Sequence, residues 1–213
     1  MTWSVDRLNG LFRSVWNAFD PRNERSSRMA RIACIVRLNV VTLQRTSEVL
    51  GMKTSGIDLE NGLWQVRAPL RSAVHLLPLT PLASSLIRTA LALRDGDGEW
   101  LFHDRRTIAR ASLGREFGKR MRALTGEDIV IHDLRHAGRM LLVAPPMRLP
   151  TTSVGNIFGH YHDHLELLAE RANPSHPVAM EDKRRTLQIW ETRLGEITND
   201  AQSDHTVPTW PAR

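Results

Sequence analysis

Three short segments of the chain carry basic side chains that could bind an anion or transfer a proton. The first, TLQRTSEVLGM, places Arg45 three residues before Glu48. The second, HDLRHAGR, places His132 and Arg135 three residues apart, so that they share one face of a helix near its N-terminus. The third, FGHYHDH, places His160 directly after a glycine. Arginine forms paired, charge-assisted hydrogen bonds with phosphate oxygens, and histidine transfers protons near neutral pH.

Each segment taken alone also has an ordinary structural explanation. Arg45 and Glu48 would form an ion pair at a helix end, worth only about 0.2–0.5 kcal/mol. Asp133 would cap the helix of the second segment, and its basic residues would then be incidental. A histidine that follows a helix-terminating glycine, as His160 does, is usually structural. A shared chemistry therefore requires that the fold bring the three segments together.

The hydrophobic pattern predicts a mainly helical chain around these segments. Apolar residues recur at helical spacing over 4–19, and 28–43 is apolar around almost the whole helix, which is typical of a buried helix. Gly51 ends the helical region that includes 28–43, and further helices are predicted over 81–92, 106–124, 132–144, 151–158, 162–172 and 179–197. The stretches SGIDLENGLWQVRAPL and VHLLPLTP predict three strands, the first two joined by a turn at Glu60-Asn61-Gly62. We therefore expect a mainly α fold with a small antiparallel β-sheet at one edge (α+β).

In order and spacing, the three segments resemble the motifs of the catalytic domain of the tyrosine recombinases, the phage-integrase family. VTLQRTSEVLGM is similar to the family's first box, with Leu43 where glycine is usual. HDLRH is similar to the H-x-x-R box, and IFGH to the L-G-H box, with Phe158 in place of leucine. The strand LLPLT, between the first two boxes, is similar to the family's V-P-L strand. Each motif is short, and their ordered combination over residues 4–197 makes the resemblance specific.

The resemblance implies DNA strand exchange with no metal and no cofactor. In this family a tyrosine hydroxyl attacks a DNA phosphodiester, forms a 3′-phosphotyrosyl bond and releases a 5′-hydroxyl. By resemblance, Arg45 and Arg135 would hold the phosphate oxygens and stabilise the charge that develops on them. His132 would assist proton transfer, and His160 would donate a hydrogen bond to the phosphate. Glu48 would orient Arg45 or His132 from behind.

The nucleophile of that reaction is not at the expected position. The chain has a single tyrosine, Tyr161, directly beside His160. The family's tyrosine follows this histidine at a distance that here falls on Ala169 and Glu170. Because neighbouring residues of a helix point about 100° apart, Tyr161 is not expected to reach the phosphate that His160 contacts.

The lysine that the family carries on its hairpin is also missing. Counting back from the third predicted strand leads to Leu70, with Arg71 beside it. Arg71 is a poor general acid because its pKa stays above about 12. Lys53 follows the first box, where relatives often have a residue that touches the DNA backbone. We therefore expect Lys53 and Arg71 to be DNA-binding residues only.

Three hypotheses follow from these residues. The first is a tyrosine-recombinase-like protein of DNA recombination and integration that binds double-stranded DNA at a scissile phosphate and is impaired in strand cleavage. The second is a catalytically dead DNA-binding remnant of a mobile element, or a regulator. The third is a metal-dependent hydrolase, since His160, His162, Asp163 and His164 come close to a zinc-binding pattern. A solvated polar turn is the more ordinary explanation of that cluster, and we expect no metal.

The composition agrees with a DNA-handling protein without establishing one. The 213 residues include 29 Lys+Arg and 23 Asp+Glu, a formal net charge of +6, which favours a polyanionic partner. The single cysteine, Cys34, excludes a disulfide framework and predicts a location in the reducing cytoplasm. No apolar run approaches the roughly 18 residues that span a membrane, and the N-terminus lacks the pattern of a signal peptide.

The resemblance also predicts how the chain is organised. We expect an integrase-like catalytic domain over 1–197 and a flexible tail over 198–213. The core-binding domain that precedes this domain in full-length integrases would be missing, which would weaken the hold on DNA. The helix over 179–197 is a candidate for docking on a neighbouring subunit, in a homo-oligomer on DNA.

Overall fold

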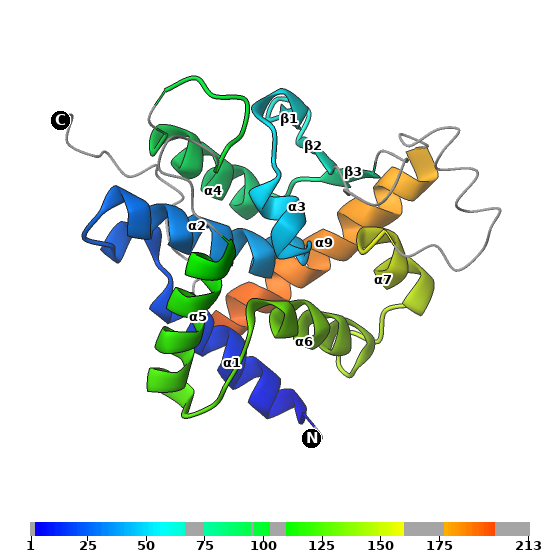
Figure 1. Ribbon diagram of the computed structural model, residues 1–213. Helices are drawn as coiled ribbons and strands as arrows, with labels where there is room; N and C mark the ends of the chain where they lie inside the picture. Colours follow the sequence, from blue (N-terminus) through cyan, green and yellow to red (C-terminus); the bar gives the residue numbers. More distant parts are fainter. Residues whose placement is uncertain (1–2, 67–74, 95, 103–109, 160–176, 199–213) are drawn as a thin grey trace.

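The computed structural model describes residues 3–66, 75–94, 96–102, 110–159 and 177–198. Within these ranges the fold is mainly helical, with a small antiparallel sheet at one edge, as the sequence predicts (Figure 1). Its helices are α1 (Val5–Ala18), α2 (Ser27–Thr42), α3 (Thr46–Leu50), α4 (Pro81–Ala92), α5 (Arg110–Thr125), α6 (Ile131–Val143), α7 (Thr151–Ile157) and α9 (Pro177–Thr198), with 3-10 turns η1 (Pro21–Asn23) and η2 (Thr54–Gly56). No helix in this part of the chain is long and apolar enough to cross a membrane.

The sheet has the order β1-β2-β3, with strands β1 (Ile57–Asp58), β2 (Leu63–Val66) and β3 (His75–Pro78). Both pairs are antiparallel, with Trp64 opposite Ile57 on one side and Leu77 on the other. The predicted turn between β1 and β2 is present. Gly62 adopts the left-handed conformation there, with φ +63°, which glycine adopts without steric cost.

The long helices α2 and α9 form the centre of the core (Figure 1). Helix α2 is buried on nearly all sides, as its apolar sequence predicts. It packs against α4, α6 and α9, while α9 also packs against α1, α7 and β3. The indole Nε1 of Trp190 on α9 donates a hydrogen bond of 2.9 Å to the carbonyl of Val40, and its ring meets Phe12 edge-on. The helix considered for docking on a neighbour is therefore a core helix of this chain.

Local sequence signals explain where several helices begin. The Oγ of Ser4 and of Ser26 and the Oγ1 of Thr80 accept backbone N–H groups at the starts of α1, α2 and α4. Pro81 occupies the first turn of α4, where its missing N–H is not needed. These helices begin within one residue of their predicted starts.

The structure differs from the sequence prediction mainly at breaks in the backbone. The helical region before Gly51 is two helices, because Leu43 adopts the left-handed conformation (φ 53°) between α2 and α3. Nothing in the side chain of Leu43 announces this conformation, which is costly for a residue other than glycine. The predicted helix over 162–172 lies outside the described residues. The tail predicted over 198–213 also lies outside them except for its first residue, Thr198, which is the last residue of α9.

Candidate functional site

Arg45 occupies the position immediately before α3 and is held there by Glu48. The Oε2 of Glu48 accepts the backbone N–H of Arg45 at 2.7 Å, and its Oε1 accepts from Nη1 of the same residue at 3.0 Å. Glu48 is buried, whereas the side chain of Arg45 is 34% exposed. The carboxylate therefore contacts both the backbone and the guanidinium of Arg45 from the interior side.

His132 and Arg135 lie in the first two turns of α6, where they differ in exposure. His132 is exposed, whereas Arg135 is only 5% exposed. Asp133 contributes to this arrangement as the third residue of the helix, because its Oδ2 accepts the N–H of Val130 at 2.8 Å. Asp133 is therefore not the N-cap residue itself. Its carboxylate reaches back to the N–H of the N-cap residue Val130, as the acidic residue of a capping box does.

Arg135 ties the three sequence motifs together. Its Nη1 donates to the carbonyl of Leu43 at 2.6 Å, and its Nη2 donates to the carbonyl of Phe158 at 3.0 Å. Its guanidinium also lies 4.2 Å from the centre of the Phe158 ring. A second link joins the outer two motifs, because Nε2 of Gln44 donates to the carbonyl of Ile157 at 2.8 Å. Segments more than a hundred residues apart therefore meet at one guanidinium.

His132 belongs to the same electrostatic environment. Its pKa lies below the ordinary value of 6.5, first because of partial burial and then because of the nearby His136, Arg135 and Arg45, which oppose a further positive charge. Asp133 acts in the opposite direction and raises the pKa. The rings of His132 and His136 meet edge-on, with centroids 4.7 Å apart. At pH 7 the imidazole of His132 is therefore mainly neutral and able to accept a proton.

Lys53 lies beyond α3, where its charge is already engaged. Its Nζ forms an ion pair with Glu99 and lies 4.5 Å from the centre of the Trp100 ring. Its side chain is 18% exposed, and the backbones of Lys53 and Trp100 form an isolated antiparallel bridge. A DNA phosphate that met Lys53 would compete with the carboxylate of Glu99.

Several predicted site residues fall outside the described ranges. His160 is the residue after Gly159, so the described chain stops one residue short of it. Arg71, Tyr161 and the rest of the histidine cluster (His162, Asp163 and His164) also lie outside. Among the residues that the structure does describe, no group of three or more His, Cys, Asp or Glu side chains is placed to hold a metal ion.

Sequence reasoning missed the backbone groups that hold Arg135. The acceptors are the carbonyls of Leu43 and Phe158, which no side-chain motif reveals. One feature of the sequence could have indicated an unusual backbone there, since glycine is usual at the position of Leu43 in the family that the sequence resembles. A usual glycine marks a backbone that needs positive φ, and Leu43 has it here.

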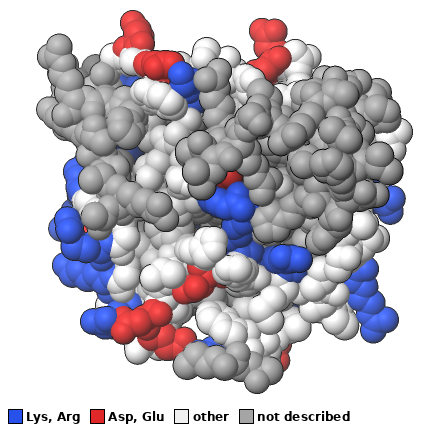
Figure 2. All heavy atoms as spheres, turned by 45° about the vertical axis from the view of Figure 1, so that its right-hand side comes forward, with Lys and Arg blue, Asp and Glu red and all other residues white. Residues whose placement is uncertain are grey.

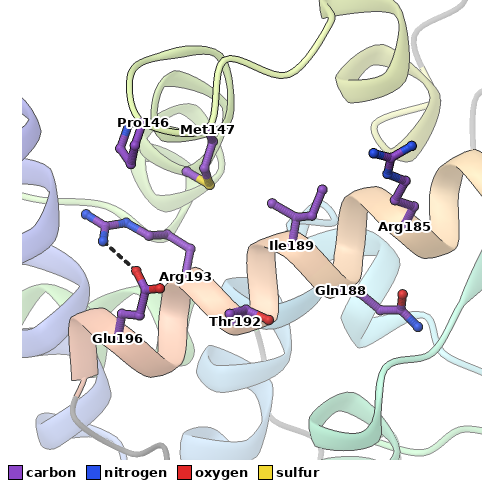
Figure 3. A pocket seen from close by; sticks show the side chains of 8 residues that line it. All are labelled: Pro146, Met147, Arg185, Gln188, Ile189, Thr192, Arg193 and Glu196. Atoms are coloured by element: carbon purple, nitrogen blue, oxygen red, sulfur yellow. Dashed lines mark hydrogen bonds and ion pairs between the residues drawn. The ribbon is translucent and has the colours of Figure 1, made fainter.

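One face of the molecule is mixed in charge. Figure 2 shows Lys and Arg side chains at the centre of this face and along its two sides, with acidic side chains at the top, at the lower left and near the centre. A separate groove of about 340 Å³ runs between α9 and the connection from α6 to α7 (Figure 3). It is lined by Pro146, Met147, Arg185, Gln188, Ile189, Thr192, Arg193 and Glu196. None of these residues belongs to the cluster around Arg135.

Comparison with solved structures finds recombinases of the same fold. The XerH site-specific recombinase bound to its difH substrate in a pre-cleavage complex has 21% identity and a TM-score of 0.59, over 76% of this chain and 51% of that chain. The XerA recombinase has 16% identity and a TM-score of 0.56, over 85% of this chain and 62% of that one. A post-cleavage XerH complex with palindromic difH has 20% identity and a TM-score of 0.53, over 88% and 50%. The alignments thus cover between half and five-eighths of those chains.

Comparison with curated proteins found no match. A comparison with models of protein families matched one described as the phage integrase family, over residues 16–165. The matched stretch contains all three motifs, including Arg45, His132, Arg135 and His160. It also spans well over half of the 213 residues. The chain therefore belongs to the phage integrase family.

Proposed function

We propose that this protein acts in DNA recombination and integration by binding double-stranded DNA at a scissile phosphate, and that its capacity for strand cleavage is impaired. The phosphate would be held by Arg45 and Arg135, with His132 and His160 completing the site. The observation that carries the proposal is the bridging of Leu43 and Phe158 by Arg135, which gathers the three motifs around one guanidinium. The XerH relatives, which share the fold, are bound to difH DNA.

The arrangement suits a phosphodiester for electrostatic reasons. Arg45 presents a partly exposed guanidinium whose position is fixed by the buried Glu48. Arg135 is held in a defined plane by two carbonyls, so little conformational entropy remains to be lost when an anion binds. Such preorganised donors stabilise the negative charge that develops on phosphate oxygens during phosphoryl transfer. His132 is neutral near pH 7 and would accept a proton beside them.

We propose impaired cleavage because two residues of the family's reaction, the nucleophilic tyrosine and the general-acid lysine, are not at their expected positions. The only tyrosine in the chain is Tyr161, and it adjoins His160 instead of standing at the nucleophile's usual distance. The hairpin position of the general-acid lysine is also without lysine, since 67–74 reads RAPLRSAV. A DNA-binding regulator that occupies a site without cutting it is the second candidate, and this loss favours it.

DNA binding is tested by fluorescence anisotropy with a labelled duplex at several salt concentrations. We expect affinity to fall steeply with salt, because each phosphate contact releases condensed counterions. Arg45→Ala should weaken binding about tenfold and lower the slope of log K against log salt by about 0.9, the contribution of one phosphate contact. Arg122→Ala is the matched control, because Arg122 is an exposed arginine on α5 that pairs with Asp128. Binding that is independent of salt, or equally affected by both variants, would contradict the proposal.

Cleavage is tested with a nicked suicide duplex that traps a covalent protein–DNA adduct. We expect no adduct on denaturing gels, because no tyrosine stands at the nucleophile's position. An adduct that forms with the wild-type protein and disappears in Tyr161→Phe would show that the protein cleaves DNA after all. The duplex must carry a plausible site, so the DNA flanking the coding sequence is the first source of substrates.

A further inference from the structure

Gly138 on α6 lies directly under the side chain of Leu43. A Cβ atom added to Gly138 would stand 2.4 Å from Cδ2 of Leu43, 3.1 Å from Cδ1 and 3.3 Å from Cγ. Distances under 3.0 Å between such atoms do not occur without a shift of one partner. The absence of a side chain at Gly138 therefore makes room for Leu43.

Leu43 has little freedom to move away from an added methyl group. Its side chain is fully buried, so neighbouring groups limit where its methyl groups can move, and Cγ itself would stand only 3.3 Å from the added atom. Its backbone has φ 53°, a conformation that already restricts a residue with a Cβ. A methyl group at residue 138 would therefore displace the backbone of Leu43 or shift α6.

The backbone of Leu43 is also what holds Arg135. The carbonyl of Leu43 accepts from Nη1 of Arg135 at 2.6 Å, a shorter hydrogen bond than the 3.0 Å bond from Nη2 to Phe158. Gly138 lies three residues after Arg135 on the same helix, so the helix is linked to Leu43 twice, by a hydrogen bond and by packing. Movement of one link changes the other.

We propose that Gly138 is a positioning residue for Arg135, and that it acts through Leu43. Where the family usually has glycine, this chain has a leucine in the left-handed conformation, and Gly138 accommodates the bulk. Leu43 and Gly138 thus form a matched pair that sets the plane of the Arg135 guanidinium. The inference rests on the proposed function in so far as Arg135 contacts a DNA phosphate.

The test is a double-mutant cycle with Gly138→Ala, Leu43→Gly and the two combined. In the wild-type background, Gly138→Ala should weaken duplex binding about tenfold and lower the salt slope by about 0.9, as expected when one phosphate contact is lost. In the Leu43→Gly background, the same change should weaken binding less than about twofold, because the clashing side chain is gone. The salt slope separates positioning from partial unfolding, since a smaller folded fraction lowers the apparent affinity and leaves the slope unchanged.

Gly114→Ala is the matched control. It makes the same change in the helix α5, where an added Cβ meets nothing within 4 Å, and it should leave affinity and slope unchanged. Two outcomes would overturn the inference. One is wild-type affinity and slope in Gly138→Ala, and the other is an equal loss in both backgrounds, which would show that the effect does not pass through Leu43.

A second readout does not depend on DNA. The arginine Nε–H signal of Arg135, assigned in NMR spectra by its disappearance in Arg135→Lys, should shift in Gly138→Ala. The same Gly138→Ala change should barely move it in the Leu43→Gly background. If the wild-type protein fails to bind duplex DNA, the proposed function is wrong, while this signal still decides whether Gly138 positions Arg135. An unshifted signal in Gly138→Ala would overturn the positioning role.

Discussion

Arg135 is a charged side chain that the fold buries almost completely, at 5% exposure. Burying a guanidinium is unfavourable unless its N–H groups find acceptors, so the carbonyls of Leu43 and Phe158 are needed for stability as well as for geometry. The same two bonds orient the group before any ligand arrives. Under the proposed function, the two bonds that compensate the burial of Arg135 would also orient it for an anion.

At the same scale, Glu48→Ala should destabilise the protein by about 1–2 kcal/mol, because the N–H of Arg45 at the start of α3 loses its acceptor. Urea unfolding measures this change. Glu181→Ala is the control, since Glu181 forms an exposed ion pair with Arg184 and such pairs contribute at most about 1 kcal/mol. Equal effects of the two substitutions would show that Glu48 does not organise α3.

The titration of His132 provides a further prediction. Its native pKa lies below 6.5, so the unfolded chain takes up the proton first as the pH falls. The contribution of His132 to stability is therefore complete above pH 6.5 and decreases as the pH drops through the window between 6.5 and the native pKa. NMR titration should give a pKa below 6.5 that moves upward in His136→Asn, since His136 is one cause of the depression. A wild-type value of 6.5 or higher would contradict this.

For individual residues, the sequence indicates the side chains of the candidate site better than it indicates the groups that they contact. Arg45, Glu48, His132 and Arg135 are recognisable from type and spacing, and the pairing of Arg45 with Glu48 is present as spacing alone predicts. The acceptors of Arg135 are carbonyls, which every residue carries, so no residue type marks them. The ion pair of Lys53 with Glu99 joins positions 46 residues apart, so local spacing could not predict it either.

Among the elements, α3 and α6 begin in the same way. In each helix the third residue is acidic, and its carboxylate accepts the N–H of the residue before the helix: Glu48 for Arg45, and Asp133 for Val130. Each carboxylate also lies near the positive end of its helix dipole, where a negative charge is stabilised. Both motif helices are thus fixed at the end that carries a motif arginine.

The connection after α3 leads to a prediction about Lys53. Glu99 neutralises Lys53 beside Trp100, so Glu99→Gln should release the lysine and tighten duplex binding by a few fold, with a steeper salt dependence. Anisotropy titrations measure both quantities. Glu60→Gln is the control, because Glu60 is exposed at the hairpin turn and the change removes the same charge. A tighter complex with both variants would mean that net charge alone is responsible.

Element boundaries were predictable where local chemistry sets them. Ser26 and Pro81 mark the starts of α2 and α4, and the Asn61-Gly62 pair marks the hairpin turn. The break between α2 and α3 was not predicted, because tertiary contacts impose a left-handed backbone on Leu43, a residue that favours helix. Local propensity fails here at a position next to the candidate site, where strained backbone is most often found.

In the whole molecule, α9 connects regions distant in sequence. Lys183 is fully buried and donates to the carbonyl of Leu76 on β3, at 3.2 Å, while Asp182 accepts from Ser153 and Asn156 on α7. Farther along the helix, Trp190 reaches α2 and α1. Helix α9 therefore joins the sheet to α7, the helix that leads to Phe158.

Loss of this connection should affect the entire domain. Trp190→Ala removes a side chain with no exposed surface and should destabilise the protein by about 3–5 kcal/mol. Trp190→Phe keeps an aromatic ring against Phe12 and loses the hydrogen bond to Val40 and part of the ring volume, so it should cost less, about 1–3 kcal/mol. Denaturant unfolding distinguishes the two values. A small effect of Trp190→Ala would show that α9 is not a core helix.

The two hydrogen bonds of Arg135 also determine when a functional site can exist. One spans 92 residues of sequence and the other 23, so both loops must close before the guanidinium reaches its final plane. A chain still emerging from the ribosome, or a fragment cut between α2 and α6, has the motif residues but not the arrangement. If Arg135 contacts a phosphate as proposed, that contact therefore becomes available only once both loops have closed.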